Sequence, residues 1–222
     1  MSRLIALDTE TTGLHSKEGD RIIEIALVEI SRATEPRHYH QLINPQGKAI
    51  GAEAMAVHGI TDDMLVDKPT FGECIDDILE FIGDDGLVIH NAPFDLEFIR
   101  DEFMEAGSIW PEPPVIDTLK LAAKEFPGAR HGLDALCNRF GVDLSSRVKH
   151  GALIDTRILA NLYLAWKGQA GLDLSASSGL KSAIVSPLRL GAMNDVRIIL
   201  PGDVKDALPA TNWAKHFEGI DL

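Results

Sequence analysis

Two carboxylates, Asp8 and Glu10, interrupt a short apolar segment near the start of the chain. The segment Arg3–Leu7 has the pattern of a buried strand, and side chains two residues apart leave a strand on the same face. Two like charges on one face repel each other unless a positive group lies between them. Solvated loop acids would give the same pattern in so acidic a chain. The pair alone therefore suggests a cation site without establishing one.

A third carboxylate, Asp155, lies on the apolar face of a helix expected over Gly151–Trp166. An acid on a face that turns toward the core must be paired or bind a metal ion. His150 stands just before this helix, where a histidine is most often a cap or a surface residue. Its nearness to Asp155 favours a functional role. The apolar residues that share the face of Asp155 are Ile158, Leu159, Leu162 and Trp166.

A fourth carboxylate, Asp95, falls in the first turn of a helix expected from Asn91 to Phe103, directly after an apolar strand. Acids favour the first turn of a helix because of its dipole, so this position alone does not indicate function.

The elements that must position these side chains follow an α/β pattern. Apolar segments predict three successive strands and then two strands interleaved with helices. Thr70 and Glu73 form a capping box that predicts a helix start. A mixed sheet flanked by helices is the expected fold. The expected strands are 3–7, 22–30, 37–43, 87–89 and 115–116, and the later helices are 118–126, 132–140 and 151–166.

The composition limits the class of protein. The 222 residues are 45% apolar and 25% charged, which excludes wholesale disorder, collagen-like repeats and a coiled coil. The net charge of −13 argues against nucleic-acid binding by a generally basic surface. It does not argue against a protein that reaches phosphates through bound metal ions.

Cysteines and apolar runs bear on the compartment. Cys74 and Cys137 are far apart, which excludes a disulfide scaffold or a zinc ribbon and favours a reducing cytoplasm. No apolar run approaches the ~18 residues of a membrane span, and the start of the chain is too short for a signal peptide. We therefore expect no membrane association.

Three segments of the chain resemble the motifs of the DnaQ-like DEDD exonuclease superfamily. Asp8, Glu10, Asp95, His150 and Asp155 fit its histidine-containing branch. The similarity is closer still to the family of epsilon proofreading subunits of bacterial DNA polymerase III, and it covers roughly residues 3–167. The three segments are LDTETTGL at 7–14, VIHNAPFDLEFI at 88–99 and HGALIDTRILA at 150–160.

The resemblance implies an RNase H-like sheet and removal of nucleotides from DNA 3′ ends by means of two divalent cations, Mg²⁺ or Mn²⁺. It implies that Asp8 bridges the two cations and that Glu10 and Asp155 complete the first site. Asp95 would help to hold the second cation. His150 would take the proton from the attacking water, a role that suits its near-neutral pKa.

The resemblance also implies a pocket for the terminal nucleotide. The alternative for Val57 and Phe94 is ordinary core packing, and the alternative for Thr11 is turn formation. The residues that fall at pocket positions are Thr11, Leu14, Val57, His58 and Phe94.

The chain beyond the expected exonuclease domain, residues 1–168, has a different character. We expect the last helix to end at about Lys167–Gly168. The following peptide, 169–174, resembles the sliding-clamp-binding peptide of bacterial replication proteins, with Gln169, Leu172 and Leu174 as anchors; a chance match is the alternative. The serine-rich segment 175–195 is typical of a flexible linker. Apolar residues in 196–222 suggest docking on the DNA polymerase III alpha subunit, or folding back onto the exonuclease domain.

Two other functions remain open at this point. A stand-alone relative that trims RNA 3′ ends would share the catalytic residues but would lack a docking segment. A scaffold that bridges polymerase and clamp would not need intact metal ligands. The leading hypothesis is a proofreading 3′→5′ exodeoxyribonuclease that releases nucleoside 5′-monophosphates.

Overall fold

The computed structural model describes residues 3–33, 35–145, 147 and 150–176. These residues belong to one unit of the chain, Ser2–Ser177. The expected docking segment and nearly all of the expected linker lie outside the described residues. Among the helices of the described part, none is long and apolar enough to cross a membrane.

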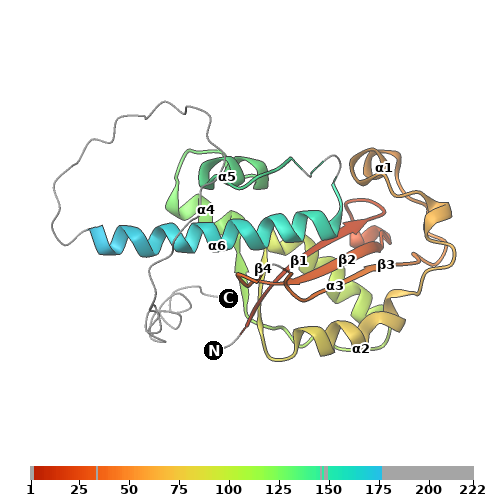
Figure 1. The fold of residues 1–222 in the computed structure, drawn as a ribbon. Coiled ribbons are helices and arrows are strands. Elements are labelled where there is room, and N and C mark those ends of the chain that lie inside the picture. Colours follow the sequence, from red (N-terminus) through yellow and green to blue (C-terminus); the bar gives the residue numbers. More distant parts are fainter. Residues whose placement is uncertain (1–2, 34, 146, 148–149, 177–222) are drawn as a thin grey trace, which may run out of the picture. The chain divides into compact units, whose positions relative to one another are not determined.

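A five-stranded mixed sheet forms the centre of the fold (Figure 1). Its strand order is β3-β2-β1-β4-β5, with β1 antiparallel to β2, β2 antiparallel to β3, and β1, β4 and β5 parallel to one another. The predicted mixed sheet is confirmed, and β1 is longer than predicted because it continues past both carboxylates. The strands are β1 Leu4–Thr11, β2 Ile22–Glu29, β3 His38–Leu42, β4 Gly86–Ile89 and β5 Val115–Asp117.

The predicted helices are all present, and the capping box at the start of α2 forms as predicted, with the Glu73 carboxylate accepting from the Thr70 N–H at 2.8 Å. The short helix α1, which lies between β3 and α2, is not among the predicted elements. The helices are α1 Ala52–His58, α2 Phe71–Ile82, α3 Ala92–Glu105, α4 Thr118–Glu125, α5 Leu133–Phe140 and α6 Ala152–Ala176.

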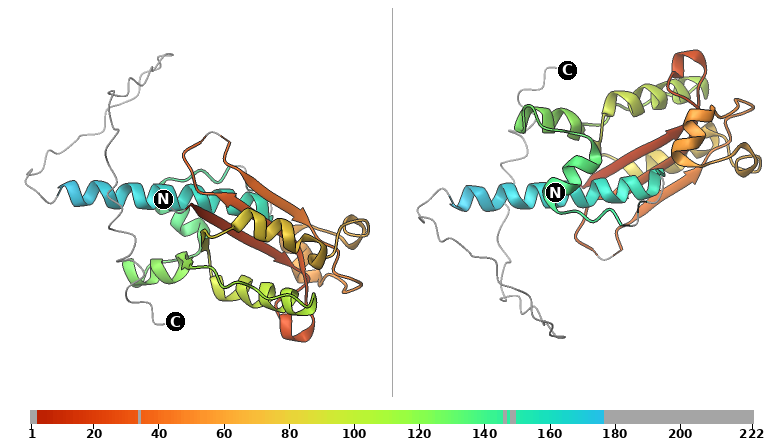
Figure 2. Two further views of the ribbon diagram at one scale, coloured as in Figure 1. Left: turned by 90° about the horizontal axis from the view of Figure 1, so that it is seen from below. Right: turned by 90° about the horizontal axis from the view of Figure 1, so that it is seen from above.

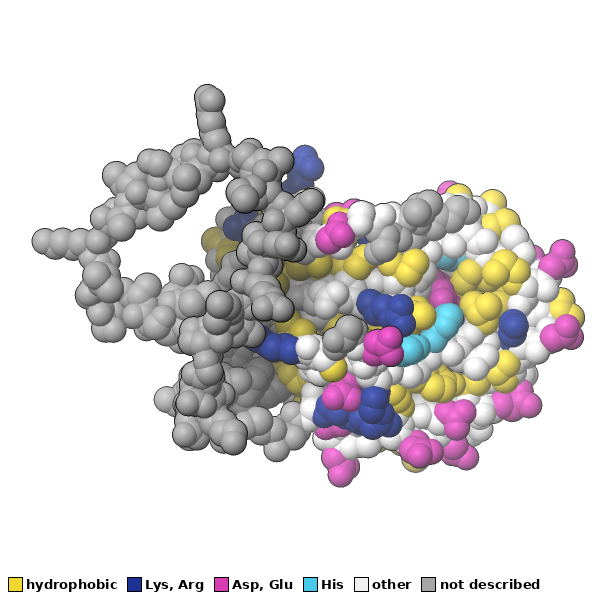
Figure 3. Space-filling model, viewed as in Figure 1, with side chains coloured by type: hydrophobic (Ala, Val, Ile, Leu, Met, Phe, Trp, Pro, Cys, Tyr) yellow, Lys and Arg dark blue, Asp and Glu magenta, His cyan; other side chains and the backbone are white. Residues whose placement is uncertain are grey.

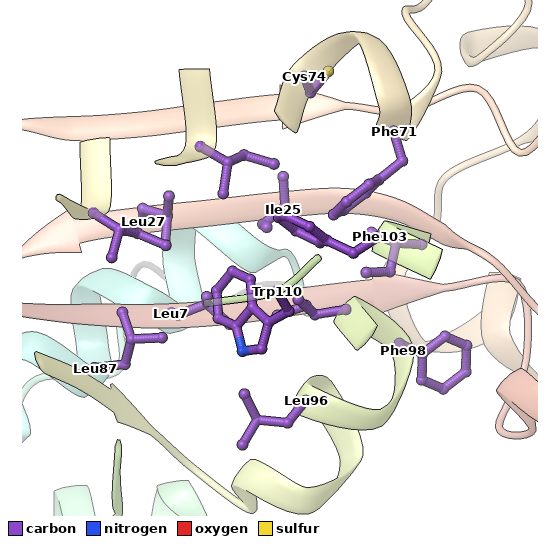
Figure 4. Packing of buried hydrophobic residues seen from close by; sticks show 14 of the residues in the cluster. Leu7, Ile25, Leu27, Phe71, Cys74, Leu87, Leu96, Phe98, Phe103 and Trp110 are labelled. Carbon is purple, nitrogen blue, oxygen red and sulfur yellow. The ribbon is translucent and has the colours of Figure 1, made fainter. Parts of the chain in front are cut away.

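The helices cover the sheet on both faces, as the two views of Figure 2 show. Ile5 and Leu7 of β1 pack with residues of α2 and α3 in one apolar cluster (Figure 4). Ala6, which points the opposite way, packs with residues of α4, α5 and α6 in another cluster. The period of two along β1 therefore sends Asp8 and Glu10 toward the face that α6 covers.

A buried carboxylate fixes α3 against the sheet. Glu102, only 3% exposed, accepts hydrogen bonds from the Arg21 guanidinium at 2.6 and 2.8 Å and from the Ile22 N–H at 3.0 Å. The pairing is needed because an uncompensated charge at this depth would cost several kcal/mol. These bonds join the C-terminal half of α3 to the start of β2.

The last helix corrects one prediction. The expected end of α6 at Lys167–Gly168 is wrong, because the helix continues to Ala176. Gly168 and Gly171 lower helix propensity by about 1 kcal/mol each but do not break a helix as proline does. The segment between them and after them also contains two alanines and two leucines, which favour helix. The peptide 169–174 therefore lies in helical backbone and not in an extended exit segment.

Candidate active site

Three of the four predicted carboxylates meet at one place. One carboxylate oxygen from each of Asp8, Glu10 and Asp155 lies within 4.8 Å of the other two. Asp8 and Glu10 come from β1, and Asp155 comes from the first turn of α6, where it is 4% exposed. The shared face that the sequence predicts for Asp8 and Glu10 is thus the face that meets Asp155.

Glu24 of β2 holds the start of α6 next to this cluster. Its Oε2 atom accepts a hydrogen bond from the Ala152 N–H at 3.0 Å, and its Oε1 atom lies 2.6 Å from Nε2 of His40. Glu24 pairs directly with Glu10 across the two strands. It therefore adds a further buried negative charge beside the predicted carboxylates, which the sequence analysis did not identify.

Asp95 lies beside the cluster but is held separately. The turn from β4 into α3 passes through Asn91, whose φ of 68° is a left-handed conformation that asparagine tolerates well. Asp95 then lies in the first turn of α3 and is 3% exposed. Its Oδ1 atom accepts from the N–H and the hydroxyl of Thr9 at 3.1 and 2.8 Å. Thr9 stands between Asp8 and Glu10, so this pair joins α3 to the end of β1 that carries the two carboxylates.

His150 is exposed and lies just before the start of α6. Its Nδ1 atom lies 3.1 Å from Oδ2 of Asp155. The ring therefore stands beside the carboxylate cluster, and its side chain is 49% exposed.

Arg147 is, with Glu24, a residue of this site that the sequence does not predict. Its Nε and Nη2 atoms donate to the two oxygens of Asp155 at 2.6 and 2.7 Å. The Nη2 atom also lies 2.8 Å from Nδ1 of His150, and the Nη1 atom contacts the carboxylate of Asp134. Its place three residues before His150 was visible, but no periodic pattern in that loop predicts which way the side chain points.

The electrostatics of the cluster favour a bound cation. Burial, reinforced by Glu24, Asp155 and Asp95, raises the pKa of Glu10 to about 8. Burial, followed by the charge of Asp95, raises the pKa of Asp8 well above its ordinary value. Burial also raises the pKa of Asp95 to about 7, although hydrogen bonds from Thr9 oppose this rise. In each case burial is the largest cause and neighbouring carboxylates add to it, so the charged forms of these groups lack a positive partner that a bound cation would supply.

The donor set fits hard divalent cations. Mg²⁺ and Mn²⁺ prefer oxygen ligands, and the three carboxylates supply oxygens close enough together to share one ion. Among the residues that the structure describes, no histidine or cysteine joins this group. A soft or nitrogen-rich metal site is therefore a poorer match to the donors.

A cavity of about 700 Å³ opens beside these carboxylates. Figure 3 shows histidine side chains next to acidic and basic side chains on the face of the molecule that is seen in Figure 1. Residues of α5 and of the loop before it also line this cavity. Its charged and histidine lining residues are Asp8, His90, Arg130, Asp134, Arg147, His150 and Asp155.

The residues predicted for the nucleotide pocket divide into two groups. Leu14 is 68% exposed and Val57 is 49% exposed, so Val57 does not pack in the core. Phe94 packs against the core cluster with its ring 5.1 Å from that of Phe98. His58 is buried and accepts a hydrogen bond from the Ile60 N–H, and Thr11 is buried with its hydroxyl bonded to the Gly13 carbonyl.

Comparison with known proteins assigns the chain to a family. The model of the RNase_T exonuclease family matches residues 5–163. The chain belongs to this exonuclease family. The DNA polymerase III subunit epsilon of Rickettsia typhi is 45% identical to it over 177 residues, which are 75% of this exonuclease and 74% of the relative. The predicted membership of the epsilon-type exonucleases is thereby confirmed.

Solved exonuclease structures agree with this assignment. Exonuclease X in complex with 5′ overhanging duplex DNA is 31% identical, with a TM-score of 0.58, and the match covers 76% of this chain and 93% of that one. The nuclease domain of 3′hExo, a DEDDh family member bound to rAMP, has a TM-score of 0.66 over 77% of this chain and 93% of that one. At 18% identity the latter confirms the exonuclease fold alone.

Proposed function

We propose that this chain is the metal-dependent 3′→5′ exonuclease that proofreads for a replicative DNA polymerase. Its substrate is a DNA 3′ end, and its product is a nucleoside 5′-monophosphate. The observation that carries the proposal is the meeting of Asp8, Glu10 and Asp155 within 4.8 Å at a cavity that also contains His150.

The carboxylates have distinct roles in this proposal. Asp8, Glu10 and Asp155 would hold one divalent cation, and Asp8 and Asp95 would hold a second. When bound, the two cations, Mg²⁺ or Mn²⁺, screen the charge of the phosphodiester and stabilise the attacking and leaving oxygens. The Thr9 hydrogen bonds occupy only Oδ1 of Asp95, which leaves its other oxygen for this role, either directly or through water.

His150 is the proposed general base. A proton on Nδ1 would be donated to Asp155 across the 3.1 Å contact, and this tautomer leaves a lone pair on Nε2. Nε2 then accepts the proton of the water whose oxygen attacks phosphorus. The bond from phosphorus to the 3′ oxygen of the preceding nucleotide breaks, and that oxygen takes a proton from solvent water and becomes the new 3′ hydroxyl.

Apolar side chains would hold the terminal nucleotide. Leu14 and Val57 are exposed, so each has free surface on which a base can stack without reading its identity. Phe94, His58 and Thr11 are more enclosed, and we assign them to the wall of the pocket. Stacking on apolar surface of this kind suits an enzyme that must remove any misplaced nucleotide.

Two protein partners complete the proposal. Epsilon relatives are named as subunits of DNA polymerase III, which supports the alpha subunit as partner of residues 196–222. Gln169, Leu172 and Leu174 would bind the sliding clamp. Since this peptide lies in α6, extended docking requires the last turns of the helix to unwind, which weakens binding. Tethering through the polymerase would offset this weakness by raising the effective concentration.

Digestion assays test the activity. Matched and mismatched primer ends, single-stranded DNA and an RNA oligonucleotide are incubated with the full chain and Mg²⁺, and the products are identified. Release of deoxynucleoside 5′-monophosphates from the 3′ end, abolished in Asp8→Asn and by EDTA, is the expected result. Preferential digestion of RNA would indicate the exoribonuclease instead, and no digestion with retained polymerase binding would indicate a scaffold.

Binding assays test the partners separately. Deletion of residues 177–222 should abolish co-purification with the alpha subunit and leave digestion of single-stranded DNA unchanged. Loss of solubility or nuclease activity would show that this segment folds back onto the exonuclease. Gln169→Ala, and Leu172→Ala with Leu174→Ala, should weaken binding to immobilised clamp; binding like that of the parent would mean that the motif is coincidental.

A further inference from the structure

The side chain of Arg147 occupies both oxygens of a proposed metal ligand. Its Nε donates to Oδ1 of Asp155 at 2.6 Å, and its Nη2 donates to Oδ2 at 2.7 Å. This two-pronged pairing is the strongest arrangement between a guanidinium and a carboxylate. Both groups are well buried, with side-chain exposures of 10% and 6%, so the pair is protected from solvent screening.

This pairing conflicts with simultaneous coordination by Asp155. A divalent cation that also touches Asp8 and Glu10 must take at least one oxygen of Asp155, since these are the ligand atoms that lie together. The guanidinium and the cation would then both contact the carboxylate of Asp155, and their positive charges would repel each other. Binding of the cation therefore favours a position of Arg147 away from Asp155.

A second acceptor for Arg147 lies within reach. Its Nη1 already contacts the carboxylate of Asp134, in the first turn of α5. Asp134 is 63% exposed and takes no part in the cluster of Asp8, Glu10 and Asp155. Arg147 can therefore keep one ion pair while it gives up the other.

We propose that Arg147 is a built-in counter-ion of the catalytic carboxylates, which holds Asp155 in the metal-free protein and is displaced onto Asp134 when the first divalent cation binds. The inference rests on the metal site of the proposed function. It adds that Arg147 competes with the first cation for the carboxylate of Asp155. The charge of Arg147 already acts on this cluster, since it opposes the rise in the pKa of Glu10.

The displacement also affects His150. A guanidinium N–H only donates, so its 2.8 Å contact with Nδ1 requires a lone pair there and places the proton of a neutral ring on Nε2. In that tautomer Nε2 cannot accept a proton from water. Departure of Arg147 allows Nδ1 to donate to Asp155 instead, which frees the lone pair on Nε2. Arg147 is therefore a positioning residue that acts through Asp155 and His150.

Calorimetric titration with Mn²⁺ alone tests the competition without measuring catalysis. Arg147→Gln should lower the dissociation constant for Mn²⁺ about tenfold, because a charged hydrogen bond to Asp155 no longer has to break. Arg130→Gln is the matched control: Arg130 lines the same cavity, and its replacement removes one positive charge while the ion pair of Arg147 with Asp155 stays intact, so its change should be much smaller. Unchanged or weaker binding in Arg147→Gln would overturn the proposal.

For a second variant, Asp134→Asn, we expect the opposite change in Mn²⁺ affinity. Asp134→Asn removes the alternative partner at an exposed position, so it should weaken Mn²⁺ binding while the chain stays folded. In the Arg147→Gln background the same change should have little effect, because the competitor is already gone. Equal weakening in both backgrounds would overturn the proposal and assign the effect of Asp134 to its general charge.

These titrations are independent of the activity assay. A chain that binds Mn²⁺ more tightly as Arg147→Gln but digests no DNA would contradict the proposed function and leave this inference standing. If the parent digests DNA as proposed but Arg147→Gln shows no gain in Mn²⁺ affinity, the proposed function stands and the inference about Arg147 is contradicted.

Discussion

The carboxylate of Glu24 accepts a hydrogen bond from the backbone N–H of Ala152, the first residue of α6, at 3.0 Å. These two residues are 128 positions apart in the sequence. The bond satisfies a backbone donor that a helix start leaves without a partner in its own helix. It also fixes the distance between strand β2 and the helix turn that carries Asp155.

Removal of the Glu24 side chain should therefore shift the start of α6 and with it the position of Asp155. We expect Glu24→Ala to lower the free energy of unfolding by about 1–3 kcal/mol, because a buried N–H loses its acceptor. Glu24→Gln keeps an acceptor oxygen and should retain most of this stability. Urea unfolding measures the difference between the two variants, and equal losses would mean that charge rather than the hydrogen bond matters.

Replacement of His150 should separate chemistry from metal binding. His150→Ala should lower the rate of 3′ digestion by roughly 10²–10⁴, the range for loss of a general base. Its affinity for Mn²⁺ should stay close to that of the parent, because the imidazole is not among the clustered ligand atoms. Single-turnover digestion and calorimetry measure the two effects. A parental rate in this variant would exclude His150 as the base.

Metal-free protein should lose stability as the pH rises. Glu10 and Asp95 have pKa values raised to about 8 and about 7 in the folded chain, above the ordinary values near 4 of the unfolded chain. Their protonated forms therefore contribute stability that is complete below about pH 4 and is lost as the pH passes through 7 and 8. Thermal unfolding in EDTA across this range should show the decline.

A matched variant isolates this effect from other titrating groups. Glu10→Gln should flatten the decline at its upper end, near pH 8, because the group that loses its proton there is gone. Saturating Mg²⁺ should flatten it in the parent as well. An identical pH profile in the variant would mean that other groups cause the decline.

Divalent cations should raise the melting temperature of the parent. A ligand that binds only the folded chain stabilises it by about 2.7 kcal/mol at 100 times its dissociation constant. Asp8→Asn should abolish the rise produced by Mg²⁺ or Mn²⁺, since Asp8 is the proposed ligand of both cations. An equal rise in this variant would indicate that the ions bind elsewhere on the acidic surface.

The sequence predicts the parts of the site that local patterns control. The shared face of Asp8 and Glu10 follows from the period of a strand, and the burial of Asp155 follows from the apolar face of its helix. Both are confirmed by the structure. The layered fold was also predictable, because alternating apolar segments leave few other ways to bury them.

The sequence does not predict contacts between distant segments. Arg147 lies in a loop without periodicity, and the Glu24–Ala152 bond joins residues whose proximity depends on the whole fold. The end of α6 was missed for a different reason. Glycine weakens a helix by an amount that neighbouring alanine and leucine residues offset, so Gly168 is a poor stop signal.

The two-sided construction of β1 has a consequence for insertions and deletions. Odd-numbered Ile5 and Leu7 face the core of α2 and α3, whereas Ala6, Asp8 and Glu10 face α6. Deletion of one residue before Asp8 would turn both carboxylates toward the hydrophobic core around Phe98 and Phe103. The same deletion would turn Leu7 toward the cation site. The strand therefore tolerates exchanges of side chains far better than changes of length. We therefore expect natural variants of this enzyme to carry substitutions within β1 and to lack insertions and deletions there.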